Sequence, residues 1–460
     1  MPEGQLTWKF PKTFWIANVI ELFERASYYG MFIALVIFLT DIVGFTDIEA
    51  GWIGGAFAAL LYLGPIFNGA LADKMGFRNA LVVAFLVLAI GYAMLGALPF
   101  KAFSIISLLL VVIGGSFVKP VIAGTVAKTT DDINRARGYS LFYQMVNIGS
   151  FSGKTIAKPL RTELGLEYIN YYAAIVALIA LVIVFFFYRN VDSTGEGKSI
   201  REILVEFKEV LTNFRFMLLI LIVAGFWLIQ GQLYATMPKY TLRLVGANAA
   251  PEWYANVNPL MVVLFVVPIT HLVRKIRPIS SIGIALAIIP LSAFSISLSP
   301  ILEDLTGQSV NFFGLIHLHP ITVMMVFGIA LQGIAECFLS PRYYEFASKQ
   351  APKGQEGLYL GYAHIHTFFA WLAGFAMSGY LLDKYCPDPK KILTAAQWLK
   401  VEQTGIDPKS LLTPEQFSQY YGHAHEIWYY FAAIGAAAFL LSLVYRWVTD
   451  WIDRKKANAG

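Results

Sequence analysis

Four side chains that carry charge or protons stand on one face of the first apolar stretch. In the run ELFERASYYGM, Glu21, Glu24, Arg25 and Tyr28 are spaced i, i+3, i+4 and i+7, which places them on one stripe of a helix. Glu21 precedes Arg25 by one turn, the favourable order for an ion pair, and Glu24 is left to pair elsewhere or to take up a proton. An ionisable side chain in hydrocarbon costs at least about 2.5 kcal/mol, so the cluster favours a wet cavity and proton transfer over a static ion pair that only fixes packing.

Two later stretches of the first half carry polar residues suited to the same cavity. Lys119 lies among apolar neighbours in GGSFVKP. We interpret it as a counter-charge for the glutamates rather than as a lysine that snorkels to a membrane interface. Tyr143, Asn147, Ser150 and Lys154 follow at i, i+4, i+7 and i+11. This second stripe is also expected to face the cavity.

The second half of the chain has a comparable polar set with fewer charges. It comprises Trp227, Gln230, Tyr234, Asn258, Gln332, Glu336 and Ser340. Glu336 is the acid expected nearest the middle of the membrane. A basic first half facing an acidic second half would hold a zwitterion by its two ends.

The elements that position these residues are long apolar helices. The 460 residues are 57% hydrophobic and 14% charged, more apolar side chain than one soluble core hides. About twelve runs reach the roughly 20 residues that cross a bilayer. We expect spans at 13–40, 50–72, 79–98, 102–126, 139–160, 168–188, 213–240, 256–273, 279–299, 319–347, 356–383 and 425–449.

The basic residues set an expected orientation. Lys and Arg fall in every second loop rather than in one basic domain, so the net charge of +5 does not indicate nucleic-acid binding, and both termini are expected in the cytoplasm. The first apolar stretch already holds glutamates and an arginine, so we expect it to be retained rather than cleaved.

The polar stretch 191–212 divides the chain into an N-terminal bundle at 1–190 and a C-terminal bundle at 213–460. A long outer loop at 384–424 has helix signals of its own. Thr394 with Gln397, and Thr413 with Gln416, are typical of capping boxes, and Gly405 and Gly422 supply stops. The loop is either a solvated connector or a lid.

Six of the seven histidines form H-x-H pairs. His317 with His319, and His423 with His425, are expected at outer helix ends, where they are either a zinc or pH site or scattered surface residues. His364 and His366 near Glu336 are the sole candidate for a catalytic site, should the protein be a membrane-embedded enzyme. The sequence has no phosphate loop, H-E-x-x-H or G-x-S-x-G motif, which argues against an enzyme. His366 either enters the cavity or packs between helices. We therefore expect no enzyme and no cofactor, with an ion gradient as the energy source.

These residues together resemble the proton-dependent oligopeptide transporters of the major facilitator superfamily. The run from Glu21 to Gly30 is similar to the E-x-x-E-R-F-x-Y-Y-G signature, and LFYQMVNIGS to F-Y-x-x-I-N-x-G-S. Lys119 before Pro120 matches the fourth-span lysine. The loop motif between spans two and three is matched by Gly69, Asp73, Gly76 and Arg78, and the polar positions of spans seven, eight and ten by Trp227, Gln230, Asn258, Glu336 and Ser340.

The resemblance implies an all-α membrane protein with the major facilitator fold, about twelve helices in two six-helix bundles, working by alternating access. It implies proton coupling through Glu21, Glu24, Arg25, Lys119 and Glu336. It implies substrate binding by Tyr28, Tyr62, Lys119, Asn147, Trp227, Gln230, Asn258, Glu336 and Ser340. A monomer in the inner membrane, moving protons and short peptides, is expected on the same basis.

Two positions depart from the family. Phe32 stands where an arginine is usual, and Ala363 where the eleventh-span tryptophan is usual. We hypothesise that Lys154 replaces the missing arginine and binds the substrate's anionic end. The expected function is proton-coupled import of di- or tripeptides or a peptide-like zwitterion; the alternative is a non-peptide anionic or amphipathic metabolite, moved inward or exported.

Overall fold

The chain forms two compact units of helices. The computed structural model describes residues 9–131, 134–189, 191, 199–312, 314–350 and 362–459. Unit 1 comprises Met1–Phe45 and Ala56–Glu206, and unit 2 comprises Thr46–Gly55 and Phe207–Gly460. The division near residue 206 falls inside the expected linker, in helix α7 (Ile200–Thr212). Thr46–Gly55 lies within the expected N-terminal bundle, 1–190, but groups with unit 2. The reason is that this segment packs on helices of the second half.

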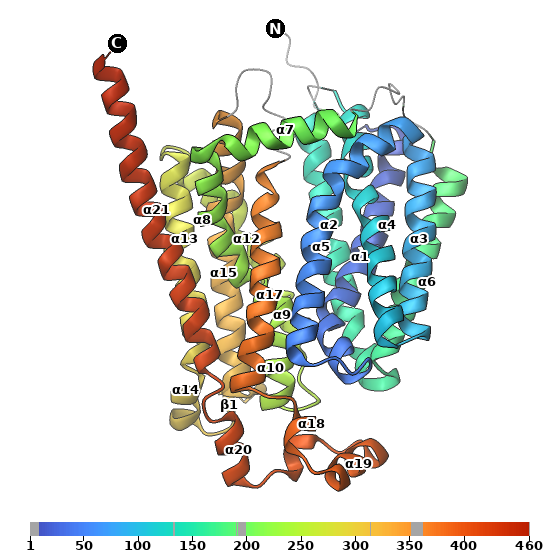
Figure 1. Ribbon diagram of the computed structural model, residues 1–460, viewed down its shortest axis with the longest axis vertical. Helices are drawn as coiled ribbons and strands as arrows, with labels where there is room; N and C mark the ends of the chain where they lie inside the picture. Colours follow the sequence, from blue (N-terminus) through green and yellow to red (C-terminus); the bar gives the residue numbers. More distant parts are fainter. Residues whose placement is uncertain are drawn as a thin grey trace. The chain divides into compact units, whose positions relative to one another are not determined.

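Unit 1 is a bundle of long helices (Figure 1). Helix α1 is the central one: it packs against α4, α5 and α6, while α3 packs against α4 and α6. The elements are α1 (Lys12–Asp41), α2 (Asp47–Met75), α3 (Phe77–Ala97), α4 (Lys101–Lys128), α5 (Arg135–Pro159), the π-helical turn η1 (Leu160–Leu164) and α6 (Leu166–Phe187).

Helices α1 and α5 approach closely because glycines line their contact. A Cβ atom added at Gly149 would lie 2.4 Å from the carbonyl oxygen of Leu22, and one at Gly153 would lie 2.2 Å from that of Ala26. Backbone cannot move aside as a side chain can, so both positions require glycine. This contact places the polar stripe of α5 beside the charged stripe of α1.

Unit 2 holds the other long helices. Helix α13 packs against α15 and α21, α12 against α15, and α8 against α17 and α21. The elements are α8 (Phe214–Gln230), α9 (Gln232–Ala235), α10 (Met237–Leu244), α11 (Pro251–Tyr254), α12 (Val257–Leu272), α13 (Pro278–Ser297), α14 (Ser299–Thr306), α15 (Pro320–Gln350), α17 (Ile365–Tyr385) and α21 (Glu426–Ala459).

The expected seventh span, 213–240, is broken into three helices. Helix α8 ends at Gln230 before Gly231, the short α9 follows, and α10 begins at Met237 with Pro238 in its first turn. Glycine weakens a helix interior, and proline has no N–H to donate. The break turns Lys239 and Arg243 on α10 into the interior of unit 2, where both are buried.

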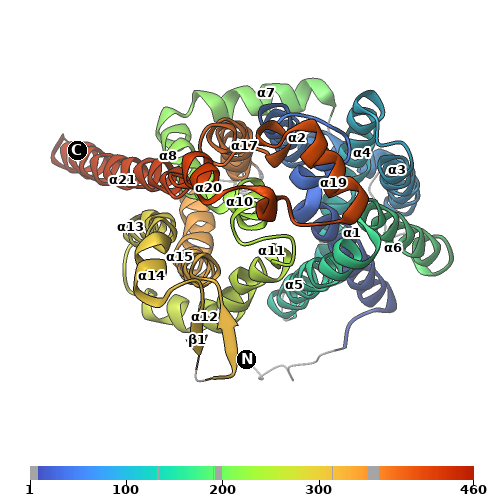
Figure 2. The same cartoon turned by 90° about the horizontal axis from the view of Figure 1, so that it is seen from below.

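One end of unit 2 carries the long loop 384–424, and we call it the loop end. Figures 1 and 2 show α18 (Pro389–Ile392), α19 (Ala395–Thr404) and α20 (Pro414–Tyr421) there, with the hairpin of β1 (Val310–Phe312) and β2 (Ile316–Leu318). The C-terminus of α21 lies at the opposite end. A 3-10 turn, η2 (Pro408–Leu411), completes the loop.

The capping signals in this loop are confirmed. Thr394 with Gln397 and Thr413 with Gln416 form both hydrogen bonds of a capping box. Gly405 ends α19 with a φ of 65°, a left-handed conformation that favours glycine, whereas Gly422 ends α20 with a φ of −57°. The loop is therefore an ordered set of short helices.

Eleven candidate spans among the described residues are long and apolar enough to cross a membrane. Helix α5 has the length of a span, with 25 residues, but its sequence RARGYSLFYQMVNIGSFSGKTIAKP carries the polar stripe. With α5 included, the six helices α1–α6 and the six longest helices of the second half give the expected twelve-helix membrane architecture.

Candidate functional site

The charged stripe of α1 forms one buried cluster in unit 1. Arg25 Nε lies 3.2 Å from Glu21 Oε1, and Arg25 also contacts Glu24 Oε2. The side chains of Glu21 and Glu24 are 1% and 3% exposed. The guanidinium also lies over aromatic rings, 5.5 Å from the centroid of Tyr28 and 6.0 Å from that of Tyr29. The two carboxylates are thus removed from bulk water, whereas the side chain of Arg25 is 11% exposed.

The cluster has one arginine for two carboxylates. Glu24 is expected to pair elsewhere or to take up a proton, and the structure shows Arg25 in contact with both acids rather than with Glu21 alone. With both acids ionised, the three residues carry one excess negative charge, which a buried site tolerates poorly. Lys119 on α4 is near enough for its charge to act on both acids. Either Lys119 or a proton can therefore balance the second carboxylate.

Two details make proton uptake chemically reasonable. Glu21 Oε2 is buried and has no hydrogen-bond partner among the described residues, so an added proton at the carboxyl group would not displace an existing bond there. Lys119, by contrast, is exposed, and its Nζ lies 5.6 Å from the ring centroid of Tyr62. The fixed acids and the exposed lysine are the parts that a proton relay needs.

Tyr28 and Phe32 pack against one another inside unit 1. Their rings stack at 5.1 Å, and Phe57 lies against both. Phe32 is fully buried. The side chain of Phe32 is therefore part of the apolar interior next to the charged cluster.

The polar stripe of α5 divides between exposed and buried positions. Tyr143 is exposed and Asn147 is half-buried, with Asn147 Nδ2 donating to Tyr143 O at 2.9 Å. Ser150 and Lys154 are buried, contrary to the expected single cavity-facing stripe, because the close contact with α1 covers this turn. Lys154 is 1% exposed, and its Nζ lies 5.8 Å from the Tyr29 ring centroid.

Unit 2 has its own acidic site, built on three helices. Glu336 of α15 accepts a hydrogen bond from Gln230 Nε2 of α8 at 2.6 Å and one from Asn258 Nδ2 of α12 at 3.4 Å, both at Oε2. Two neutral amides thus hold one oxygen of a carboxylate, and no basic side chain takes part in these bonds. Ser340, one turn further along α15, is half-buried. An ammonium group is the chemical partner that this arrangement favours.

Trp227, one turn before Gln230 on α8, lies beside His366. Their ring centroids are 5.5 Å apart, and Tyr343 lies edge-on to His366 at 5.1 Å. His366 is 1% exposed and hydrogen-bonds the carbonyl of Ala363 through Nδ1. Of the two alternatives for His366, the structure shows the packed one. Trp227 itself is half-buried.

The residues of the loop motif lie at the end of α2 and the start of α3, and Gly76 forms the turn between these helices. Gly76 has a φ of 79°, a conformation that favours glycine, and it starts α3. Arg78 Nη2 donates to Phe185 O at 2.6 Å and so satisfies a carbonyl at the end of α6. Gly69 faces Pro120 of α4, and Asp73 is half-buried near the end of α2.

The histidines at the loop end are not gathered into a metal site among the described residues. Among the described residues no group of three His, Cys, Asp or Glu side chains has the geometry to hold a metal ion. His319 accepts a hydrogen bond from Ile321 N, His423 pairs with Glu426, and His425 packs edge-on to Tyr429. His317 lies on β2 within 3.4 Å of Ser309 Oγ.

Sequence reasoning missed one charged site. Asp47, at the start of α2, contacts Lys239 and Arg243 of α10, and all three are buried. The signal was present, since Lys239 and Arg243 are spaced i, i+4. The break in the seventh span hid it, because a continuous span over 213–240 would place Lys239 at its end and Arg243 in the following loop.

Two units of membrane-spanning helices, with a buried acid–base cluster in one and an amide-held carboxylate in the other, define a membrane transport protein of the major facilitator type. The sequence pattern of the Major Facilitator Superfamily matches residues 17–313. The chain belongs to this superfamily.

Curated relatives and solved structures agree with that assignment. The chain is 31% identical over 199 residues to dipeptide and tripeptide permease B of Salmonella typhimurium (42% of this chain, 40% of the relative). It is 30% identical over 191 residues to the permease B of Aliivibrio fischeri (41% and 38%). The matched parts thus span about 40% of the length of these relatives.

Over nearly the whole chain, the fold is similar to those of two solved proteins. One is an auto inhibited POT family peptide transporter, with a TM-score of 0.70 at 18% identity, covering 95% of this chain and 97% of that chain. The other is a POT family transporter in complex with a thioalcohol conjugated peptide, with a TM-score of 0.70 at 19% identity and coverage of 96% and 97%. These matches show the major facilitator fold.

Proposed function

We propose that the protein is a proton-coupled symporter that imports di- or tripeptides by alternating access. The observation that carries the proposal is the α1 cluster, in which one arginine serves two buried carboxylates. A site with one acid in excess gains or loses a proton when its second cation moves. Lys119, exposed on α4, is that second cation in the proposal.

Unit 2 supplies recognition of the substrate in this proposal. Glu336, held by Gln230 and Asn258, binds the amino terminus of the peptide and replaces part of its hydration with a charge-assisted hydrogen bond. Trp227 and Tyr62 line pockets for side chains, and Asn147 binds the peptide backbone. In the proposal, these hydrogen bonds and pockets hold the peptide while it is transported.

The choice of peptide over a non-peptide metabolite rests on the relatives. Several are named dipeptide and tripeptide permeases, and their matches span about 40% of their own length. Phe32 is fully buried and stacks on Tyr28, so its position gives no reason of its own to favour another solute.

The proposal includes an orientation and a location. The loop end faces outward, and the opposite end, with the C-terminus, faces the cytoplasm of a cell whose inner membrane holds the protein as a monomer. The basic residues that alternate between loops support this orientation.

Transport by proteoliposomes tests the function directly. Vesicles loaded at pH 7.5 and diluted into pH 6.0 buffer should accumulate labelled Ala-Ala above the outside concentration, and a protonophore should abolish the excess. A tenfold excess of unlabelled Ala-Ala should compete, whereas free alanine should not. Folded protein that accumulates no di- or tripeptide from a mixed panel would contradict the proposal.

A further inference from the structure

The hairpin between α14 and α15 has one apolar face and one polar face. Its two strands run antiparallel, with the cross-strand pairs Val310–Leu318, Asn311–His317 and Phe312–Ile316. Successive side chains of a strand point to opposite faces, and the two residues of a cross-strand pair share a face. The four apolar residues of these pairs therefore lie on one face, whereas Asn311 and His317 lie on the other.

The turn of the hairpin is fixed by its own hydrogen bonds. Asn311 Oδ1 accepts from Gly314 N at 2.7 Å, and Leu315 N donates to Phe312 O at 3.0 Å. Gly314 has a φ of 75°, in the left-handed region that favours glycine. The turn therefore has a defined shape, and it carries Leu315 at the tip of the hairpin.

The apolar face is exposed toward this tip. The exposed fraction is 38% for Phe312, 54% for Ile316 and 85% for Leu315. Val310 and Leu318, at the base of the hairpin, are half-buried. A two-stranded hairpin is marginally stable in water unless one of its faces packs against something. The described residues cover the base of the apolar face and leave its tip uncovered.

Helix α14, directly before the hairpin, also exposes apolar side chains. Ile301 and Leu305 are both exposed, and their i, i+4 spacing places them on one side of the helix. Exposed apolar residues are therefore concentrated in the segment from 301 to 316.

The charges of the two loop-end connections differ sharply. No Asp, Glu, Lys or Arg occurs between Asp304 and Glu336. The loop 384–424, at the same end of unit 2, carries acidic and basic residues along its whole length. Charged side chains are unfavourable next to hydrocarbon, whereas they are well solvated in water. The composition of the hairpin therefore suits a lipid surface, and that of the long loop suits water.

The hairpin lies where the spans of unit 2 reach the membrane surface. The candidate span of α15 begins at Pro320, two residues after β2 ends. Thr322 Oγ1 lies 3.5 Å from Tyr254 Oη of α11, which directly precedes the span of α12. Figure 2 shows the strands projecting sideways past α12 rather than across the helices of unit 2. The hairpin therefore extends from the rim of the unit, where lipid surrounds it.

We propose that the hairpin is a membrane-surface anchor, with Phe312, Leu315 and Ile316 inserted into the leaflet at the loop end. Asn311 and His317, on the opposite face, point to water. Amphipathic segments at this interface bury their apolar faces about 5–10 Å into the boundary between headgroups and acyl chains. The anchor sets the depth at which α15 enters the bilayer. The proposal rests on the membrane location of the protein and is independent of the solute.

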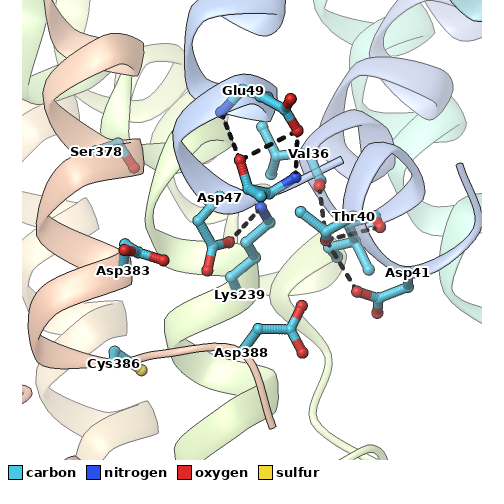
Figure 3. Close-up of polar contacts among 12 residues, drawn as sticks. Val36, Thr40, Asp41, Asp47, Glu49, Lys239, Ser378, Asp383, Cys386 and Asp388 are labelled. Atoms are coloured by element: carbon cyan, nitrogen blue, oxygen red, sulfur yellow. Dashed lines mark hydrogen bonds and ion pairs between the residues drawn. The ribbon is translucent and has the colours of Figure 1, made fainter. Parts of the chain in front are cut away.

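Site-directed spin labelling measures this depth. Both native cysteines are buried, Cys337 in the core of unit 2 and Cys386 directly after α17 (Figure 3). A cysteine introduced at an exposed position is therefore labelled preferentially, and the unmutated protein gives the background. The samples are nanodiscs of phosphatidylcholine and phosphatidylglycerol with one protein each. Power saturation compares collisions of the label with oxygen, which concentrates in the bilayer, and with a water-soluble nickel chelate.

Neighbouring positions on opposite faces form the matched pair. The ratio of oxygen to nickel collisions should be several-fold higher for Ile316→Cys than for His317→Cys, and it should be highest for Leu315→Cys. Leu399→Cys is the control, because this exposed leucine lies on α19 in the charged loop at the same end. Its label should collide mainly with the nickel chelate. All four positions are exposed, so the label requires no rearrangement of the fold.

Two results would overturn the anchor. Collisions mainly with nickel at 315, 316 and 317 would place the whole hairpin in water. Labels at 315 and 316 that neither reagent reaches would show that protein, rather than lipid, covers the apolar face.

A second set of variants tests whether the apolar face itself holds the tip in the leaflet. With the label at Leu315→Cys, the added changes Phe312→Ser and Ile316→Ser should shift collisions toward nickel. His317→Ser, on the polar face, should leave the ratio unchanged. An equal ratio in both backgrounds would contradict the role given to the apolar face. Because no solute is present, these results stand apart from the outcome of the peptide uptake experiment.

Discussion

Arg25 Nε lies 3.2 Å from Glu21 Oε1, one helical turn away on α1, and the same arginine contacts Glu24. One permanent cation thus neutralises one of two buried acids. The other must be balanced by Lys119 or by a proton. In the proposed symport, a movement of Lys119 away from the pair leaves a proton to balance the second acid, and this is how the proposal links transport to protonation.

Glu336 is predicted to recognise the peptide's amino group. Glu336→Gln keeps the shape of the side chain but removes its charge, so the charge-assisted bond to an ammonium group is lost, at a cost of about 1.5–3 kcal/mol. Affinity for Ala-Ala should fall about tenfold or more, as measured by competition with labelled peptide. Asp304→Asn on α14 removes an exposed acid and should leave affinity unchanged.

An N-blocked peptide distinguishes the roles that remain for Glu336. N-acetyl-Ala-Ala has no ammonium group, so its weak binding should be the same for the unmutated protein and Glu336→Gln. A Glu336→Gln variant that binds Ala-Ala normally would refute the assignment.

Lys154 was hypothesised to bind the anionic end of the solute, yet the structure buries it against Tyr29. Direct binding requires Lys154 to leave that ring during the cycle. On this hypothesis, Lys154→Met raises the apparent KM for Ala-Ala about tenfold but leaves that for the carboxamide Ala-Ala-NH2 unchanged. Equal values of KM for Ala-Ala before and after the substitution would assign Lys154 to packing within unit 1.

The contact between α1 and α5 should be intolerant of a single methyl group. In Gly153→Ala the new Cβ would lie 2.2 Å from a backbone oxygen of Ala26, so the helices must separate. Overpacking of this kind costs about 1–3 kcal/mol or more, and the melting temperature should fall by several degrees. Gly283→Ala on α13, where no atom lies within 4 Å of the new Cβ, is the matched control. If Gly153→Ala melted at the same temperature as Gly283→Ala, the contact between α1 and α5 would be looser than described.

His319 should make the stability of the loop end depend on pH. Burial, helped by the charge of Lys409, lowers the pKa of His319 to about 4 from its usual 6.5. Because the unfolded chain takes up this proton at higher pH than the folded one, the stabilisation is complete above pH 6.5 and is lost as pH falls toward 4. Protonation also removes the acceptor that His319 Nδ1 offers to Ile321 N.

The measurement is the melting temperature between pH 7.5 and pH 5. The fall on acidification should be smaller in His319→Gln than in the unmutated protein. His317→Gln, at an exposed position on β2, should retain the full fall. If the melting temperature fell by the same amount in all three proteins, His319 would not be the cause of the pH dependence.

Much of the fold could be predicted because a membrane-spanning helix needs a long apolar run, which is visible in the sequence. Helices α15 and α21 begin at Pro320 and Glu426, close to the expected bounds at 319 and 425, although α21 continues to Ala459, beyond the expected 449. Both expected capping boxes are present. The break of the seventh span at Gly231 could not be placed, since an isolated glycine is tolerated in many helices. The hairpin of β1 and β2 was also missed, because three-residue strands have no periodicity to detect.

The site was predictable where it lies on one helix and less so where it depends on several. The i, i+3, i+4 spacing brought Glu21, Glu24 and Arg25 together as expected. It could not show that Arg25 serves both acids, which depends on side-chain rotamers. Lys154 shares a stripe with Asn147 in sequence, but the approach of α1 buries one and leaves the other half-buried. The ion pairs of Asp47 with Lys239 and Arg243 join residues 192 and 196 positions apart, and periodicity carries no information at that range.

The most direct test of proton coupling through α1 is the uptake of labelled Ala-Ala by proteoliposomes containing Glu24→Gln, beside the exposed-site control Glu163→Gln. The account predicts that Glu24→Gln loses accumulation driven by an acidic exterior yet still exchanges labelled for unlabelled peptide at equal pH, while Glu163→Gln does both. Accumulation by Glu24→Gln at the level of the unmutated protein would contradict it.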